Sequence, residues 1–211
     1  MSFPLAVSVQ KISGAFWVLP AARNYFKDRK INWKFAISFS LLGLIGTYFG
    51  SFLVINGNQR ILEMSVGILI LILVTYTFLK KDLGIKEKKI HSKARQLALY
   101  ILAPILGFYE SFFGAGSAIV FSIAGFHTRG FDFVDGIGYT YIVAFPWLVF
   151  MSFVLIRDGY YDLSIMIAAV CGSLVGAQVG SHYAQYKGNK FIKTLFIVIG
   201  GILGLKLVLG L

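Results

Sequence analysis

Charged side chains are scarce in this sequence of 211 residues: they make up 14% of it, whereas 57% of the residues are hydrophobic and 16% are aromatic. The mean hydropathy is +0.77. A chain of this length and composition has far more apolar surface than a soluble domain could bury. The scarcity of charge therefore excludes a soluble globular protein and predicts an integral membrane protein.

Cysteine is almost absent, since Cys171 is the single one. One cysteine excludes an intrachain disulfide and a cysteine-rich metal site, and we expect Cys171 to be a small apolar packing residue. The sequence also lacks an HExxH motif, paired carboxylates within its apolar runs and a Gly/Lys loop of the kind that cradles phosphate. These absences predict no enzyme activity, no metal, no cofactor and no ATP-driven mechanism.

Acidic residues are few as well, with 9 Asp and Glu against 20 Lys and Arg, which gives a net charge of +11. Five of the basic residues lie in Ala22–Lys34 and seven in Lys80–Gln96. Both segments lie on one side of the membrane because two apolar runs separate them, and their charge predicts the cytoplasmic side. We interpret them as topology signals, with contact to anionic lipids as a second role, and not as a nucleic-acid site.

Long apolar runs are what the sequence has in abundance, and several approach the roughly 20 residues that a membrane-spanning helix needs. They predict an all-α, multi-pass protein of the cell membrane with about seven transmembrane segments. No basic region followed by a cleavage site marks a secretory signal, so we expect the first run to be retained. The seven runs are Phe3–Ala21, Phe35–Val54, Ile61–Leu79, Leu97–Phe126, Ile137–Ile156, Leu163–Tyr183 and Phe191–Leu211.

The chain repeats itself without gaps at an offset of 130 residues, which pairs Gly46 with Gly176 and Gly50 with Gly180. Glycines four residues apart allow helices to approach closely in lipid, so helix packing is the expected role of these four. We divide the chain into a first, incomplete repeat at 1–84, a basic cytoplasmic linker at 85–96 and a second repeat at 97–211. Duplication of this kind is a common way to build a transporter.

The offset leaves the opening element of the second repeat without a counterpart in the first repeat. This element begins at Gly107, and its partner would precede residue 1. We therefore expect a Gly-rich apolar stretch encoded upstream, or a partner chain that supplies one; a homo-oligomer is a further possibility.

The stretch GFYESFFGAGSAIVF, which begins at Gly107, places the carboxylate of Glu110 and three glycines inside an apolar run. Glu110 lies 15 residues after Arg95, about 22 Å along a helix, and so past the middle of a bilayer core of about 30 Å. A carboxylate at that depth usually faces a bundle interior or a water-filled path. The alternatives are that it reaches the far interface or satisfies a neighbouring helix.

Glycine weakens helices, and the run Leu97–Phe126 is longer than one straight crossing requires. Two half-helices broken around ESFFGAGS fit it as well as one tilted helix. At such a break, the amide groups of a half-helix can hold an anion, with hydroxyl donors added by Ser111 and Ser117. One crossing makes the two halves parallel; a hairpin makes them inverted and places Lys187–Lys190 on the cytoplasmic side, which the charges favour slightly.

This stretch resembles the GFYDGFFGxGTG type of motif in the sulfite exporter TauE/SafE family of membrane transporters. ILEMSVGILILILVTY and KFIKTLFIVIGGILGLKLV are similar to spans of that family, and the resemblance covers essentially the whole chain. The Gly-rich run is reduced here to Gly114, Ala115, Gly116 and Ser117, and the family's amino-terminal Gly-rich element is absent. The resemblance implies export or exchange of small anions such as sulfite or sulfonates.

A polar cluster, SVQKIS, interrupts the first apolar run, and its partner at the offset of 130 is GYTYIV. Lys11 in that cluster needs a counter-ion, which a substrate anion or Glu110 could supply; alternatively, it extends to the interface. A non-transporting membrane scaffold remains the alternative function. The predicted substrate-binding residues are Gln10, Lys11, Ser13, Glu110, Ser111, Gly114, Gly116, Ser117, Tyr139, Thr140 and Tyr141.

Overall fold

The computed structural model describes residues 2–86, 90, 92–112, 114 and 116–210, and all regular structure within them is α-helical. Five of the helices are long and apolar enough to cross a membrane: α1, α2, α3, α6 and α7. This confirms the prediction of an all-α, multi-pass membrane protein. The helices are α1 (Phe3–Tyr25), α2 (Trp33–Asn56), α3 (Gln59–Leu79), α4 (Lys93–Phe112), α5 (Ser117–Thr128), α6 (Phe133–Arg157) and α7 (Leu163–Leu209).

Four of the helices begin at an Asn or Asp whose side chain accepts a hydrogen bond from the backbone N–H three residues further on. These residues are Asn32, Asn58, Asp132 and Asp162. Such a cap satisfies one of the N–H groups that the first turn of a helix leaves without a partner. Each cap therefore fixes the point at which the chain leaves a loop and enters an apolar run.

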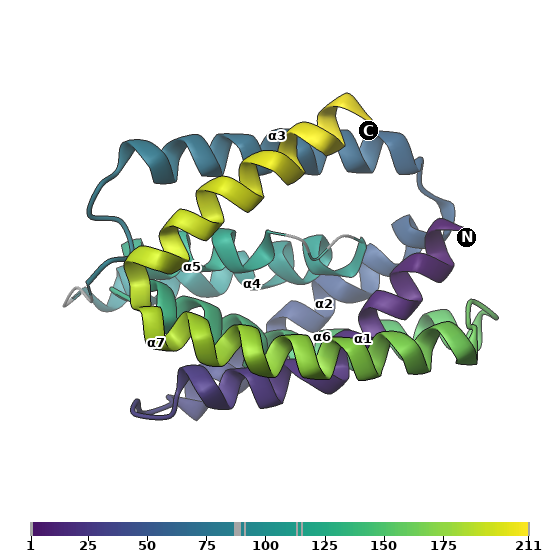
Figure 1. Ribbon diagram of the computed structural model, residues 1–211, viewed down its shortest axis with the longest axis horizontal. Coiled ribbons are helices and arrows are strands. Elements are labelled where there is room, and N and C mark those ends of the chain that lie inside the picture. Colours follow the sequence, from purple (N-terminus) through teal and green to yellow (C-terminus); the bar gives the residue numbers. More distant parts are fainter. Residues whose placement is uncertain (1, 87–89, 91, 113, 115, 211) are drawn as a thin grey trace.

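The last helix, α7, is two crossings joined at a sharp kink (Figure 1). Gly188 has φ 75° and ψ −172° there, a backbone conformation that glycine adopts and other residues avoid. The chain turns back at this point, so residues 163–187 and 189–209 run in opposite directions. The two separate apolar runs that the sequence predicts for this region are thus present.

The segment from α4 to α5 is a hairpin and not a single crossing (Figure 1). The ring of Tyr100, near the start of α4, lies 5.6 Å from that of Phe35, and the guanidinium of Arg129, just after α5, lies 3.8 Å from the same Phe35 ring. Both ends of the segment therefore lie at one end of the bundle. The two halves of the chain are accordingly inverted, the arrangement that the loop charges favour.

The bundle has a basic end and an opposite end. The basic end comprises residues 26–32, 80–86, 129–132 and 187–190, while the opposite end holds residues 57–58, 158–162 and the first and last helical turns of the chain (Figure 1). By the positive-inside tendency, the prediction that the basic loops face the cytoplasm applies to this whole end.

An ion-pair network joins the loops at the basic end. Arg29 donates to both carboxylate oxygens of Asp132 at 2.9 and 2.8 Å and pairs with Asp135 at 2.9 Å. Asn189, beside the α7 kink, donates to Asp132 at 3.0 Å and to the Ile85 carbonyl at 3.0 Å. Burial lowers the pKa of Arg29, but the bonds to the two aspartates outweigh burial, so the pKa lies above its usual value.

The repeat at an offset of 130 pairs α1 with α6, α2 with the first part of α7, and α3 with its second part. Paired glycines have different surroundings, however. A Cβ added to Gly46 would lie 1.7 Å from the Pro104 carbonyl oxygen of α4, and one added to Gly50 would lie 2.7 Å from Ser111, whereas Gly176 and Gly180 have nothing within 4 Å. The packing role expected for these glycines holds for α2 and does not hold for α7 among the described residues.

The outer surface of the bundle is apolar, with exposed side chains such as Ile37, Phe49 and Ile167. A surface of this kind suits lipid contact. Cys171 belongs to this surface, since it is exposed on α7. Its predicted role as a small apolar packing residue is therefore wrong, because Cys171 is exposed and not packed against a neighbouring helix among the described residues.

Candidate functional site

The break between α4 and α5 lies within the bundle and exposes the beginning of α5. Gly114 and Gly116 have φ values of 71° and 82°, in the left-handed region that glycine adopts most readily. Residues 113 and 115, which belong to the predicted motif, lie outside the described residues. The 12 residues of α5 extend for about 18 Å, too short for a full crossing, so the break lies inside the membrane core.

Lys11 and Glu110 form a buried ion pair at this break. The Lys11 ammonium donates to the Glu110 backbone carbonyl and, at 3.3 Å, to its Oε1. Lys11 is fully buried and Glu110 is 6% exposed. Lys11 is therefore no interfacial anchor, and the charge on each side chain is balanced by the other.

Gly114 lies directly against this pair. A Cβ added there would lie 2.6 Å from Glu110 Oε1, 3.0 Å from Gln10 Nε2 and 3.0 Å from Lys11 Nζ. The absence of a side chain at Gly114 thus lets three polar groups from α1 and α4 converge at the break. This is a close approach that only glycine permits.

A cavity of about 250 Å³ lies beside the ion pair, and we call it the polar cavity. Eight of the predicted site residues line it: Gln10, Ser13, Glu110, Gly114, Gly116, Ser117, Thr140 and Tyr141. They come from α1, α4, α6, the break before α5 and the first residue of α5. The structure therefore brings both halves of the repeat to one cavity.

Three predicted site residues do not line the polar cavity. Lys11 contacts Glu110 instead of the cavity itself. Ser111 donates to the Thr47 and Gly107 carbonyls at 3.1 and 2.8 Å, where α4 packs on α2. Tyr139 accepts a hydrogen bond from the Asn32 N–H at 2.8 Å and stacks on Phe131 near the basic end. Successive side chains of a helix point about 100° apart, so Tyr139 points away from the cavity that Thr140 and Tyr141 line.

Six further residues line the polar cavity that sequence reasoning did not select: Gly14, Trp17, Val18, Ala118, Ala144 and Leu148. A signal for two of them was present, since Gly14 pairs with Ala144 at the offset of 130. Trp17 is held by Tyr141, whose ring centroid lies 5.0 Å from that of the indole in an edge-on arrangement. These residues give the polar cavity an apolar wall.

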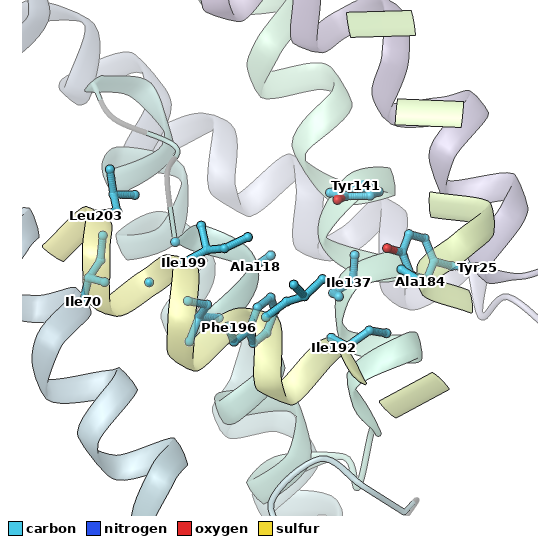
Figure 2. Close-up of a pocket in the computed structure, with 14 residues that line it drawn as sticks. Tyr25, Ile70, Ala118, Ile137, Tyr141, Ala184, Ile192, Phe196, Ile199 and Leu203 are labelled. Carbon is cyan, nitrogen blue, oxygen red and sulfur yellow. The ribbon is translucent and has the colours of Figure 1, made fainter. Parts of the chain in front are cut away.

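A second cavity of about 280 Å³ adjoins the first and is almost wholly apolar (Figure 2). Tyr25 and Tyr141 lie at one end of it, and Ile70 and Leu203 lie at the other (Figure 2). Gly116, Ala118 and Tyr141 line both cavities. The beginning of α5 and the Tyr141 ring therefore separate a polar compartment from an apolar one.

A family model for the sulfite exporter TauE/SafE matches residues 1–207 of this sequence. The chain belongs to the TauE/SafE family. The resemblance carried by the stretch from Gly107 to Phe121 is thereby confirmed, and with it a place among membrane transporters.

Relatives of this TauE/SafE chain carry names of the same kind. It is 27% identical over 214 residues to the probable membrane transporter protein ORF9 of Sinorhizobium sp, covering 95% of this chain and 77% of the relative. It is 21% identical to a probable membrane transporter protein of Haemophilus influenzae, over 97% and 80% of the two chains. It is 24% identical to YdhB of Bacillus subtilis, over 92% and 80%. No solved structure gives a significant match.

The chemistry available in this TauE/SafE chain is electrostatic. Among the described residues, no three His, Cys, Asp or Glu side chains lie close enough together to hold a metal ion. The polar cavity instead offers hydroxyl and amide groups, a carboxylate whose partner is an ammonium, and the first turn of α5. The hydroxyl and amide donors among these groups can replace part of the hydration shell of a small anion.

Proposed function

We propose that this protein moves small anions, such as sulfite or sulfonates, across the cell membrane, and that the polar cavity is where the anion binds. The observation that carries the proposal is the buried Lys11 ammonium beside a cavity at a broken helix. Substrate sites of many secondary transporters lie near the bilayer midplane, between repeats and at discontinuous helices. The position of the polar cavity between the two repeats and at the broken segment supports this assignment.

Three groups support an anion over a cation in this cavity. Lys11 brings a full positive charge, and the Ser117 hydroxyl and the N-terminal turn of α5 bring partial ones. Glu110 opposes an anion, but its charge is matched by Lys11. The volume of about 250 Å³ is enough for an anion of a few heavy atoms with some of its water.

Flux into proteoliposomes tests the proposal. The full chain is reconstituted, and uptake of sulfite and of methanesulfonate is followed beside uptake of a monovalent cation of similar size. We expect anion flux above that of protein-free vesicles, and loss of it in Lys11→Gln. Anion flux equal to that of the empty vesicles, with correctly folded protein and with no anion flux in cells that express the chain, would instead make it a membrane scaffold that does not transport.

We also propose that the open face of α7 is covered by a hairpin of the α4–α5 kind, contributed by this protein or by a partner chain. Support comes from the repeat: Gly46 and Gly50 of α2 receive α4, and their counterparts Gly176 and Gly180 line a groove of about 370 Å³. Gly176→Leu should leave the purified chain stable and abolish transport in cells, with Val179→Leu on the same helix as control. Unchanged transport in Gly176→Leu would mean that the groove faces lipid.

A further inference from the structure

The charges beside the polar cavity determine whether an anion can bind there without a second ion. Lys11 and Glu110 are the charged side chains at this site among the described residues, and together they are neutral. An anion that enters alone would give the buried site a net negative charge. An unbalanced charge in a low-dielectric interior is strongly unfavourable.

The positions of Lys11 and Glu110 lead to the same conclusion. The Lys11 ammonium donates to Oε1 and to the backbone carbonyl of Glu110, and Glu110, not Lys11, lines the polar cavity. An anion in the cavity therefore meets the carboxylate first. To pair with the ammonium, it must replace that carboxylate as the counter-ion of Lys11.

We propose that the substrate anion binds at Lys11 only together with one proton, which is held by the Glu110 carboxyl group. The proposal rests on the proposed function and adds the ion that is coupled to it. Protonation removes the negative charge from Glu110, frees the Lys11 ammonium to pair with the anion and keeps the site neutral. The proton comes from the water on the side from which the anion enters, so the two cross as an electrically neutral pair.

The surroundings of Glu110 leave it as the group that takes the proton. The titratable groups that face it are Lys11 from α1, Tyr109 beside it on α4, and Tyr141 from α6, which lines the same cavity. Lys11 is the ammonium of the ion pair and the two tyrosines carry hydroxyl protons, so the carboxylate is the group among them that can take a proton up. In the described part of α2 and α5, no ionisable side chain lines this cavity.

Gly114 gives the carboxyl group the freedom this exchange needs. Its missing side chain leaves room beside Glu110 Oε1, where a Cβ would lie only 2.6 Å away. Because position 114 has no side chain, the protonated carboxyl group can turn from the ammonium towards the break before α5. The break before α5 thus forms part of the anion site and also leaves room for the movement of Glu110 that couples the proton to the anion.

Calorimetry of anion binding tests the proposal without a variant. The purified full chain is titrated with methanesulfonate, an anion that does not itself titrate between about pH 5.5 and about pH 8, in two buffers of different ionisation enthalpy. We expect uptake of about one proton per anion and an affinity that falls about tenfold for each unit of rising pH in the range where Glu110 is ionised. Binding without proton uptake and with the same affinity at every pH would overturn the proposal.

Two variants locate the proton. Glu110→Gln should bind the anion with no proton uptake and with an affinity that does not change with pH, because the amide imitates the neutral carboxyl group. Glu63→Gln is the matched control, since Glu63 lies on α3 outside the polar cavity and accepts a hydrogen bond from Gln59, and it should behave like the parent. Proton uptake that persists in Glu110→Gln would overturn the assignment to Glu110. Absence of anion binding at every pH would refute the proposed function itself, and this inference with it.

Discussion

The Lys11 ammonium and the Glu110 carboxylate are 99 positions apart in the sequence and 3.3 Å apart in the structure, and neither is more than 6% exposed. Removing one member of such a pair leaves the other charge buried without a partner. A loss of that kind typically costs about 3 to 5 kcal/mol. Substitutions in this pair can therefore separate the effect of side-chain charge from the effect of side-chain shape.

Lys11→Gln should weaken anion affinity by more than Lys11→Arg does, because Arg keeps the charge and changes only its geometry. Titration of the purified variants with methanesulfonate measures the difference. The double variant Lys11→Gln with Glu110→Gln should recover most of the thermal stability lost in Lys11→Gln, since no buried charge then remains. Equal affinity in the parent and in both single variants would remove Lys11 from the anion site.

The glycines paired by the repeat should respond differently to the same substitution. Gly46→Ala should destabilise the protein by about 1 to 3 kcal/mol or more, because its Cβ would meet the backbone of α4 at Pro104. Gly176→Ala should leave stability unchanged or raise it by up to about 1 kcal/mol, since nothing lies within 4 Å and Ala favours the helix. Thermal unfolding in detergent measures both. Equal destabilisation by the two would contradict the open face of α7.

The ion pairs at the basic end should matter more than those at the opposite end. Asp132→Asn removes the carboxylate that Arg29 and Asn189 share, and should lower the free energy of unfolding by about 1 to 3 kcal/mol. Arg157→Ala breaks an exposed pair with Asp158 at 3.6 Å and should have no measurable effect. Unfolding curves of the two variants, recorded at the same salt concentration, give the comparison. Indistinguishable curves would show that the network does not hold the loops together.

The inverted arrangement predicts which residues an impermeant reagent can reach from each side of the membrane. In a Cys171→Ser background, Lys187→Cys should react with an impermeant maleimide only from the cytoplasmic side, and Tyr161→Cys only from the outside. Both positions are exposed and avoid the glycines with positive φ at Gly159 and Gly188. Labelling of Tyr161→Cys from the cytoplasmic side and of Lys187→Cys from the outside would contradict the hairpin of α4 and α5.

The sequence by itself determined the environment of the protein and most of its membrane segments. Apolar runs of membrane-spanning length and two basic loops follow from composition alone, because lipid requires both the length and the helical conformation. The repeat at an offset of 130 and the glycines at the break could also be identified from the sequence. Lys11 and Glu110 stood out since charges are rare at that depth.

Only the tertiary structure decided how the apolar runs are arranged and which side chains meet. Leu97–Phe126 is long enough for one tilted crossing or for a hairpin, and only the packing of Tyr100 and Arg129 on Phe35 selects the hairpin. The direction of a side chain depends on how its helix is rotated against its neighbours, so Thr140 faces the polar cavity and Tyr139 does not. Whether Lys11 reached an interface or met Glu110 depended on the placement of α1 against α4, which the local sequence does not contain.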